Sequence, residues 1–374
     1  MINEAIIKSD EKAIFELREL YRQYGYSQFK MSRFEEYDLY VKNKDFLVSD
    51  EVITFTDKNG RLMALKPDVT LSIIKNTTDS PGKLQKVYYN ENVYRVSKGT
   101  HSFKEIMQAG LECIGDLNDY EIAEVVLLAV KSLALVSRNY VLDISHMGLV
   151  AAMLEDSGLS YEGKGMAHTF LHQKNSHELR AVCTAENLPE DKTEKLCALI
   201  DCCGSASQVL SKISPLLSSQ KEKEAFEQFR TLCDIIERSG FANSVIVDFS
   251  VGNDMKYYSG VVFKGYLEGL PTSILSGGQY DKLLRKMKRQ SGAIGFALYL
   301  DMLEQMEDSS NEYDVDTVLL YTKDADPITI TSAVDRLANS AHSVRVCTQI
   351  PSQLRYRRLL KLTDGRIETL EENG

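Results

Sequence analysis

The sequence lacks an apolar stretch long enough to cross a membrane. No run of about 18 apolar residues, the length that a transmembrane helix needs, occurs in its 374 residues. Residues 1–4 read Met-Ile-Asn-Glu and carry neither the basic segment nor the apolar segment of a secretory signal peptide. We therefore expect a cytoplasmic protein that has no membrane partner.

Cysteine pairs with the spacing of metal ligands are also missing. The seven cysteines are scattered without a Cys-x-x-Cys pair, and the nearest arrangement is Cys202 beside Cys203, whose side chains point apart. This usage is typical of buried, reduced thiols. Among the histidines, His168 and His172 have helical spacing, but no cysteine or acid completes a zinc set. We predict no metal site and interpret the two histidines as a solvent-facing helix pair.

Glycine-rich phosphate loops and an excess of positive charge are absent as well. Neither GxxxxGK[ST] nor GxGxxG occurs, and 44 Lys and Arg against 54 Asp and Glu give a net charge of −10. This balance disfavours nonspecific binding of polyanions, although a local basic face would be hidden in the total. Basic clusters at 282–289 and 355–361 indicate solvated helix faces, with RNA contact as the alternative. We expect neither a cofactor nor a nucleic-acid partner.

Alternating helical and β patterns fill the first third of the chain. Apolar residues at steps of three and four predict helices in residues 5–24 and 119–136. Residues 52–65 predict a hairpin around Asn59-Gly60, because this dipeptide tolerates the positive φ of a tight turn. Residues 86–114 predict a second strand-loop-strand unit.

The rest of the chain adds helices and then returns to strands. The further elements expected are a block of helices at about 147–240, strands at 244–249 and 257–263, a β run ending at Gly277-Gly278, helices at 281–289 and 294–306, an acidic linker at 307–313 and a β-α-β unit at 317–321, 328–338 and 343–347. A mostly antiparallel sheet with interspersed helices is an α+β arrangement. We expect a core domain at 1–306 that contains the helical insertion, and a small α/β domain at 314–374.

Two segments of the first half resemble the histidyl-tRNA synthetases and their paralogues. Residues 65–70 read Leu-Lys-Pro-Asp-Val-Thr, close to the family's Leu-Arg-Pro-Glu-x-Thr. Residues 108–112 read Gln-Ala-Gly-Leu-Glu, where the family has Gln-x-Gly-x-Glu, and they follow Tyr94-Arg95 at the place of the motif 2 Phe-Arg.

Two later segments continue the resemblance in the family's order. Residues 257–263 read Tyr-Tyr-Ser-Gly-Val-Val-Phe, similar to the Tyr-Tyr-Thr-Gly-x-Val-Phe of histidine-binding members. Residues 276–281 and 295–297 are similar to Gly-Gly-Arg-Tyr-Asp and Gly-Phe-Ala around motif 3. The resemblance implies the antiparallel sheet with flanking helices of class II aminoacyl-tRNA synthetases, followed by a truncated C-terminal domain.

The resemblance also implies a pocket for histidine. Free histidine needs a carboxylate for its α-ammonium group and polar partners for both ring nitrogens. By resemblance, the α-amino group is faced by Asp68, Thr70 and Gln108, the imidazole is held by Glu112 and Tyr258, and the wall is formed by Tyr257. We expect these groups on strands, which are well placed for rigid recognition. The alternative is that the two tyrosines are ordinary strand aromatics and that Asp68 and Thr70 cap a helix.

The arginines needed for adenylation are depleted. Adenylation gathers negative charge, which arginines must clamp. Arg95 remains in motif 2, and Lys104 replaces a second arginine, which keeps the charge but not the bidentate fork. These two are candidate residual anion contacts. Met302 stands where motif 3 has an arginine, and Tyr299 stands where it has a glycine.

The histidine-specific segment shows the same depletion. Asn253 replaces the arginine characteristic of histidine activation, and Lys256 replaces an acid. A donor lost from a catalytic site costs on the order of 10²–10³ in rate. We therefore expect no adenylation and no catalytic residues.

A synthetase-like core with lost arginines and a shortened C-terminus resembles the regulatory subunits of ATP phosphoribosyltransferase. That resemblance implies a non-catalytic subunit of the first step of histidine biosynthesis. It implies a homodimer core in a hetero-oligomer, commonly an octamer, that activates a short catalytic subunit and transmits feedback inhibition by histidine. The alternatives are an RNA-binding or tRNA-sensing paralogue and an active, divergent histidyl-tRNA synthetase.

Overall fold

The computed structural model describes residues 7–44, 52–79, 82–97, 100–252, 257–303, 313–339 and 343–373. The chain divides into two units, Asp10–Leu303 and a smaller one made of Glu304–Gly374 with Met1–Ser9. The predicted linker at 307–313 lies outside the described residues except for Tyr313.

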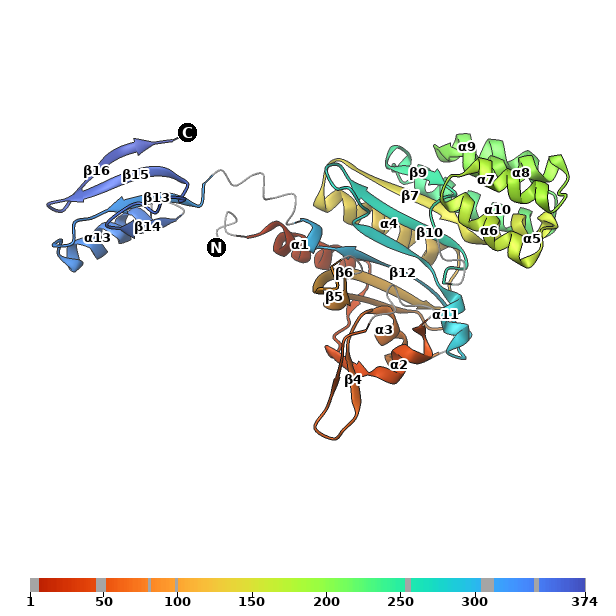
Figure 1. Ribbon diagram of the computed structural model, residues 1–374, viewed down its shortest axis with the longest axis horizontal. Coiled ribbons are helices and arrows are strands. Elements are labelled where there is room, and N and C mark those ends of the chain that lie inside the picture. Colours follow the sequence, from red (N-terminus) through yellow and green to blue (C-terminus); the bar gives the residue numbers. More distant parts are fainter. Residues whose placement is uncertain are drawn as a thin grey trace. The chain divides into compact units, whose positions relative to one another are not determined.

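A long sheet forms the centre of the Asp10–Leu303 unit (Figure 1). In the described residues its nine strands follow the order β1 (Ser27–Gln28), β5 (Gln85–Val96), β6 (Phe103–Gly115), β12 (Gly292–Tyr299), β11 (Leu275–Gln279), β10 (Val261–Leu267), β7 (Tyr140–His146), β9 (Val245–Asp248) and β8 (Cys203–Gly204). Neighbouring strands are antiparallel except for β1 with β5 and β7 with β9. This arrangement confirms the predicted α+β class.

Two helices with apolar faces cover one side of this sheet. α1 (Ser9–Gln23) and α4 (Asp119–Val136) meet where the Tyr21 hydroxyl lies 3.0 Å from the Ser132 hydroxyl. The ring of Tyr21 lies 6.1 Å from the ring of Phe296 on β12. α4 runs across β7, β10, β11 and β12, as its buried stripe of valine, leucine and alanine side chains requires.

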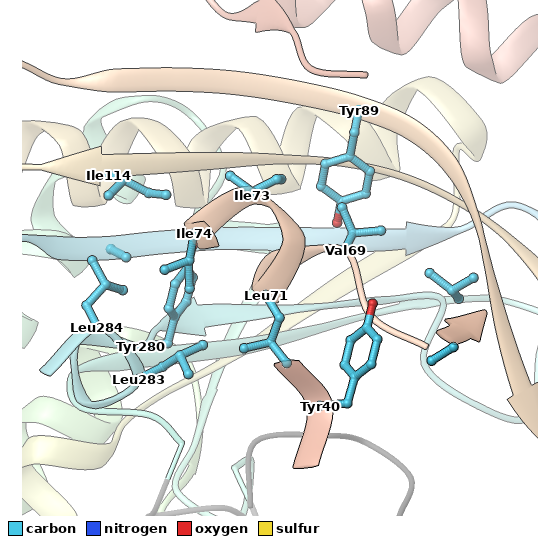
Figure 2. Packing of buried hydrophobic residues seen from close by; sticks show 13 residues of the cluster. Tyr40, Val69, Leu71, Ile73, Ile74, Tyr89, Ile114, Tyr280, Leu283 and Leu284 are labelled. Atoms are coloured by element: carbon cyan, nitrogen blue, oxygen red, sulfur yellow. The ribbon is translucent and has the colours of Figure 1, made fainter. Parts of the chain in front are cut away.

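The opposite side of the sheet carries α3 (Thr70–Asn76), packed at the β5–β6 end. Figure 2 shows Leu71, Ile73 and Ile74 of this helix among buried side chains that include Tyr89 and Ile114 of the sheet. Burying one such aliphatic side chain contributes about 1.5–3 kcal/mol. α3 is therefore held firmly by the core although it has only two turns.

Short elements surround α3 on the same side. They are β2 (Phe34–Glu36), α2 (Tyr37–Lys42), β3 (Thr54–Thr56), β4 (Leu62–Leu65) and α11 (Asp281–Lys286). β3 and β4 form the predicted hairpin, in which Gly60 takes a φ of +80°. The helix expected at 281–289 ends at Lys286.

The predicted helical insertion is present, with one difference. Its helices are α5 (Met147–Ser157), α6 (Tyr161–His172), α7 (Ser176–Ala185), α8 (Glu190–Asp201), α9 (Ala206–Ile213) and α10 (Gln220–Arg238). Figure 1 shows them gathered at the β7–β9 end of the sheet. The difference is β8, because Cys203 and Gly204 leave the helical block and pair with β9.

We expect Asn118→Ala to lower the free energy of unfolding by about 1 kcal/mol, because Asn118 and Glu121 form a capping box at the start of α4. Urea unfolding of the two proteins measures the change. The matched control is Ser205→Ala at the start of α9, where no side-chain cap is present. Equal effects of the two substitutions would contradict the prediction.

Two predicted helices are wrong, and in both cases a strand is found. Residues 294–306 were predicted as a helix, but β12 occupies Gly292–Tyr299 between β6 and β11. The run Ile-Gly-Phe-Ala-Leu-Tyr is apolar throughout because one face of this central strand packs against the helices and the other carries small residues, so it lacks the alternation that marks a half-buried strand. The basic cluster at 355–361 lies largely on β15 (Tyr356–Thr363), not on a helix.

The C-terminal unit contains the predicted β-α-β order and continues into a further hairpin. Its described elements are β13 (Val315–Leu320), α13 (Pro327–Ala338), β14 (Val344–Cys347), β15 and β16 (Arg366–Glu372). The sheet order is β14-β13-β15-β16, and β13 is parallel to both of its neighbours. None of the helices in the described part of the chain combines the length and apolarity needed to span a bilayer.

Candidate functional site

The six residues predicted to bind histidine line one cavity of about 390 Å³ in the Asp10–Leu303 unit. Asp68 and Thr70 come from the turn into α3, Gln108 and Glu112 come from β6, and Tyr257 and Tyr258 precede β10. Segments 190 positions apart in the chain (68 to 258) thus meet at one place.

Small residues on the sheet form the floor of this cavity. Paired residues on neighbouring antiparallel strands point to the same face. Glu112 is paired with Gly295, and Gly295 is paired with Gly278. In the next row, Gly110, Ala297 and Ser276 follow one another. Three central strands therefore present little side-chain volume on this face, and the cavity occupies that space.

Glu112 is the buried polar centre of the cavity. Its side chain is 2% exposed, and it accepts hydrogen bonds from the Thr70 hydroxyl at 2.7 Å and from the Tyr280 hydroxyl at 2.5 Å. Burial raises the pKa of Glu112 to about 8, although the two hydroxyl donors act in the opposite direction. Glu112 is therefore mostly protonated at neutral pH but close to its point of titration, which suits a partner for a titratable imidazole.

The turn into α3 carries two of the predicted residues. Asp68 accepts a hydrogen bond from the Leu71 backbone N–H at 2.9 Å, so it caps α3 while also lining the cavity. Loss of solvation raises the pKa of Asp68, and the nearby Arg95 opposes this rise. Thr70 uses its hydroxyl for Glu112 and not for a cap. The alternative interpretation as a capping pair thus applies to Asp68 only.

Aromatic rings close one side of the cavity. Tyr257 lies with its ring centroid 4.7 Å from Tyr258 and 5.9 Å from Tyr280. Tyr258 packs against the backbone of Gly278, where a Cβ atom would lie 2.8 Å from the tyrosine ring. Both predicted tyrosines belong to the turn before β10. The expectation that all six residues lie on strands is therefore right for Gln108 and Glu112 and wrong for the other four, which come from turns and a helix start.

The two candidate anion contacts lie opposite each other on β5 and β6 but differ in position. Arg95 lines the cavity and donates from Nε to the Pro67 carbonyl at 3.1 Å. Lys104 is exposed and is not among the lining residues. The buried Lys66 side chain forms an ion pair with Glu91 at 3.0 Å, so the Lys66–Pro67 segment is held from β5 at two points. The structure thus brings Arg95, and not Lys104, to the cavity.

The replaced catalytic positions are partly described. Tyr299 lines the cavity from β12, so a bulky side chain stands where the resemblance places a glycine. Met302 is half-buried just after that strand. Asn253 and Lys256 lie outside the described residues.

For three lining residues with titratable side chains, no role was predicted from the sequence: Tyr89, Lys264 and Tyr280. Tyr280 belongs to the segment 276–281, so its place in the motif was the signal that could have identified it. Tyr89 is fully buried, and its ring covers Gly110. Lys264 gave no signal, because a single lysine in an apolar strand pattern is indistinguishable from an outward-facing one.

The histidines and cysteines of the described chain do not form a metal centre. No group of three or more His, Cys, Asp or Glu side chains among the described residues is placed to hold a metal ion. His172 is half-buried and lies 2.7 Å from the Ser250 carbonyl through Nδ1, so the solvent-facing interpretation is wrong for it. All seven cysteines are free thiols, of which Cys203 is exposed and Cys347 is half-buried.

Comparisons with known proteins identify the relatives of this chain. The sequence profile described as histidyl-tRNA synthetase matches residues 3–303. An ATP phosphoribosyltransferase regulatory subunit from Clostridium acetobutylicum is 26% identical over 356 residues, which cover 92% of this chain and 87% of that protein. The crystal structure of an ATP phosphoribosyltransferase regulatory subunit/histidyl-tRNA synthetase from Bacillus halodurans C superposes with a TM-score of 0.73 at 25% identity and covers 94% of this chain and 93% of that one.

A third similarity is to the ATP phosphoribosyl transferase (HisG:HisZ) complex from Thermotoga maritima. One chain of that complex superposes with a TM-score of 0.61 at 17% identity and covers 77% of this chain and 96% of its own length. This likeness shows the shared fold alone. The profile match spans most of the chain and covers the sheet, the helical insertion and the cavity. The chain belongs to the histidyl-tRNA synthetase family.

Proposed function

We propose that this protein is a non-catalytic regulatory subunit of ATP phosphoribosyltransferase that binds histidine in the cavity described above. It activates a short catalytic subunit for the first step of histidine biosynthesis and transmits feedback inhibition by histidine. The observation that carries the proposal is the convergence of six histidine-binding candidates on a cavity that Tyr299 also lines. The names of the relatives from Clostridium acetobutylicum and Bacillus halodurans C support the regulatory role.

The chemistry of the cavity suits an imidazole amino acid. Asp68 offers a carboxylate for the α-ammonium group, with Gln108 and Thr70 beside it. Glu112 and Tyr258 offer a carboxyl and a hydroxyl to the ring nitrogens. Buried polar groups of this kind discriminate strongly, because a ligand that fails to pair with them leaves them unsatisfied.

The same cavity offers little support for adenylation. Tyr299 reduces the space along β12, and Arg95 is the arginine among the described lining residues. A phosphate clamp requires several cationic donors that act together on the transition state. Binding without activation is the function that these groups support.

Feedback requires histidine to bind the active and the inhibited assemblies with different affinities. We propose that the catalytic subunit joins a homodimer core of this chain in a hetero-oligomer, commonly an octamer. The name of the Thermotoga maritima complex supports this pairing.

No observation favours the RNA-binding alternative. In the C-terminal cluster, Arg355 pairs with Asp314 at 2.8 Å, and Arg357 and Arg358 pair with Asp316 at 2.9 Å and 2.7 Å. These guanidinium groups are therefore already matched by carboxylates within their own unit, which weakens their attraction for phosphates.

We expect the purified chain to raise the rate of phosphoribosyl transfer at least tenfold when it is mixed with a short ATP phosphoribosyltransferase catalytic subunit. The measurement is the formation of phosphoribosyl-ATP at increasing ratios of the two proteins, with and without histidine. The chain alone is expected to show no histidine-dependent exchange of pyrophosphate into ATP. Exchange by the chain alone, or an unchanged transferase rate, would overturn the proposal.

A further inference from the structure

Lys264 places a positive charge in the cavity that the residues assigned so far do not explain. It lies in the middle of β10, where it is paired with Ser276 of β11 on one side and with Asp143 of β7 on the other. Side chains alternate between the two faces of a strand, so Lys264 lies on the same face as Val262 and Tyr266. This is the face that forms the cavity floor. The side chain is half-buried and lines the cavity.

A bound amino acid brings a group that still lacks a partner. Asp68, Thr70 and Gln108 serve the α-ammonium group, and Glu112 and Tyr258 serve the ring. The α-carboxylate then needs a cation, and the described lining residues supply Arg95 and Lys264. Arg95 has one donor committed to the Pro67 carbonyl. Within the described part of the chain, the Lys264 ammonium has no hydrogen bond and no carboxylate oxygen at ion-pair distance.

Two carboxylates lie beyond Lys264 on the strands β7 and β9. Asp143 faces it across the strand pair, and Asp248 lies beside Asp143. Asp248 is engaged by the Lys174 ammonium at 2.6 Å and by the Ser250 hydroxyl at 2.7 Å. Burial and the negative charge of Asp248 raise the pKa of Asp143 to about 6, so Asp143 is mostly ionised at neutral pH and places negative charge on the β7 side of Lys264.

The floor between Lys264 and Glu112 is open. Ser276 and Ala297 separate Lys264 from Gly110, and Gly278 and Gly295 fill the neighbouring row. A lysine on β10 can therefore extend across the small residues toward a ligand whose other end is held at β6. A cavity of about 390 Å³ has room for a whole amino acid between these two ends.

We propose that Lys264 binds the α-carboxylate of the amino acid, so that the site selects a zwitterion over the corresponding alcohol or amine. This inference rests on the proposed function and deepens it by naming the group that determines specificity. Lys264 and Asp68 both line the cavity and carry opposite charges. The two charges match those of the zwitterionic ligand. Removing the Lys264 charge lowers the affinity for a ligand that has a carboxylate and leaves the affinity for a ligand without one almost unchanged.

The experiment is calorimetry on the full chain with L-histidine, L-histidinol and histamine. We expect the wild type to bind histidine at least tenfold more tightly than histidinol. Lys264→Met is expected to lower the affinity for histidine tenfold or more and the affinity for histidinol less than twofold. Lys264→Arg is expected to keep most of the preference for histidine over histidinol. The matched control is Lys104→Met, which removes an exposed lysine on β6 that does not line the cavity and is expected to change neither affinity.

The outcomes separate the two proposals. If the wild type binds none of the three compounds, the proposed function fails and the role of Lys264 fails with it. If the wild type binds histidine and Lys264→Met keeps the same ratio of histidine to histidinol affinity, the role of Lys264 alone is overturned. Unchanged thermal unfolding of the variants shows that a loss of affinity does not come from misfolding.

Discussion

Gly295→Ala is expected to abolish measurable histidine binding and to destabilise the protein by about 2–3 kcal/mol. A Cβ atom at this position would lie 1.8 Å from Oε2 of Glu112 and 2.5 Å from the Leu111 carbonyl oxygen. The carboxyl group has no free direction to move, because Thr70 and Tyr280 hold its two oxygens. The methyl group therefore displaces Glu112 or forces β12 away from β6, and either change destroys the cavity floor.

The matched control for this prediction is Gly165→Ala in α6, where a Cβ atom meets nothing within 4 Å. Alanine is the better helix former by up to about 1 kcal/mol, so this variant should keep or raise stability and leave binding unchanged. Urea unfolding and calorimetry with histidine measure both effects. Histidine binding by Gly295→Ala within threefold of the wild type would show that the Glu112 carboxyl is not part of the ligand site.

Glu112→Gln is expected to make the protein more stable than the wild type at pH 8. It is also expected to reduce the fall in the free energy of unfolding between pH 6.5 and pH 8. The folded pKa of Glu112 is about 8, above its ordinary value of 4.5. Between these two values the folded state keeps a proton that the unfolded state has released, so stability falls as pH rises. A fully retained proton corresponds to a slope of about 1.4 kcal/mol per pH unit. The slope falls to half of this at the folded pKa, so the stability lost between pH 6.5 and pH 8 is about 1.5 kcal/mol.

Urea unfolding of the wild type and Glu112→Gln at half-unit steps of pH measures this difference. Asp143→Asn is the matched control, because the pKa of Asp143 is raised to about 6 and its contribution is complete below the chosen window. That variant should reduce the change in the free energy of unfolding between pH 4 and pH 6 and leave its slope with pH above pH 6.5 unchanged. A wild-type slope above pH 6.5 that persists in Glu112→Gln would mean that Glu112 is ionised in the folded protein at neutral pH.

The periodic segments were predictable because their pattern is local. The helix at 119–136 matches α4 at both ends, since a capping asparagine begins it and a continuous apolar stripe fills it. The hairpin of β3 and β4 follows from Asn59-Gly60 in the same way. β12 was not predictable by this route, because a strand with apolar residues on both faces has no alternation and matches a buried helix in composition.

Of the cavity residues, the sequence identified those that lie in the short motifs, among them Asp68, Glu112 and Tyr258. Their placement was decided by the tertiary structure. Tyr280 became a partner of Glu112 only through the β11–β12 pairing that carries it to the cavity. Lys264 became a lining residue through a register that sets it opposite Ser276. Strand register assigns each side chain to one face of a sheet, and it depends on partners distant in the chain, so no local pattern contains it.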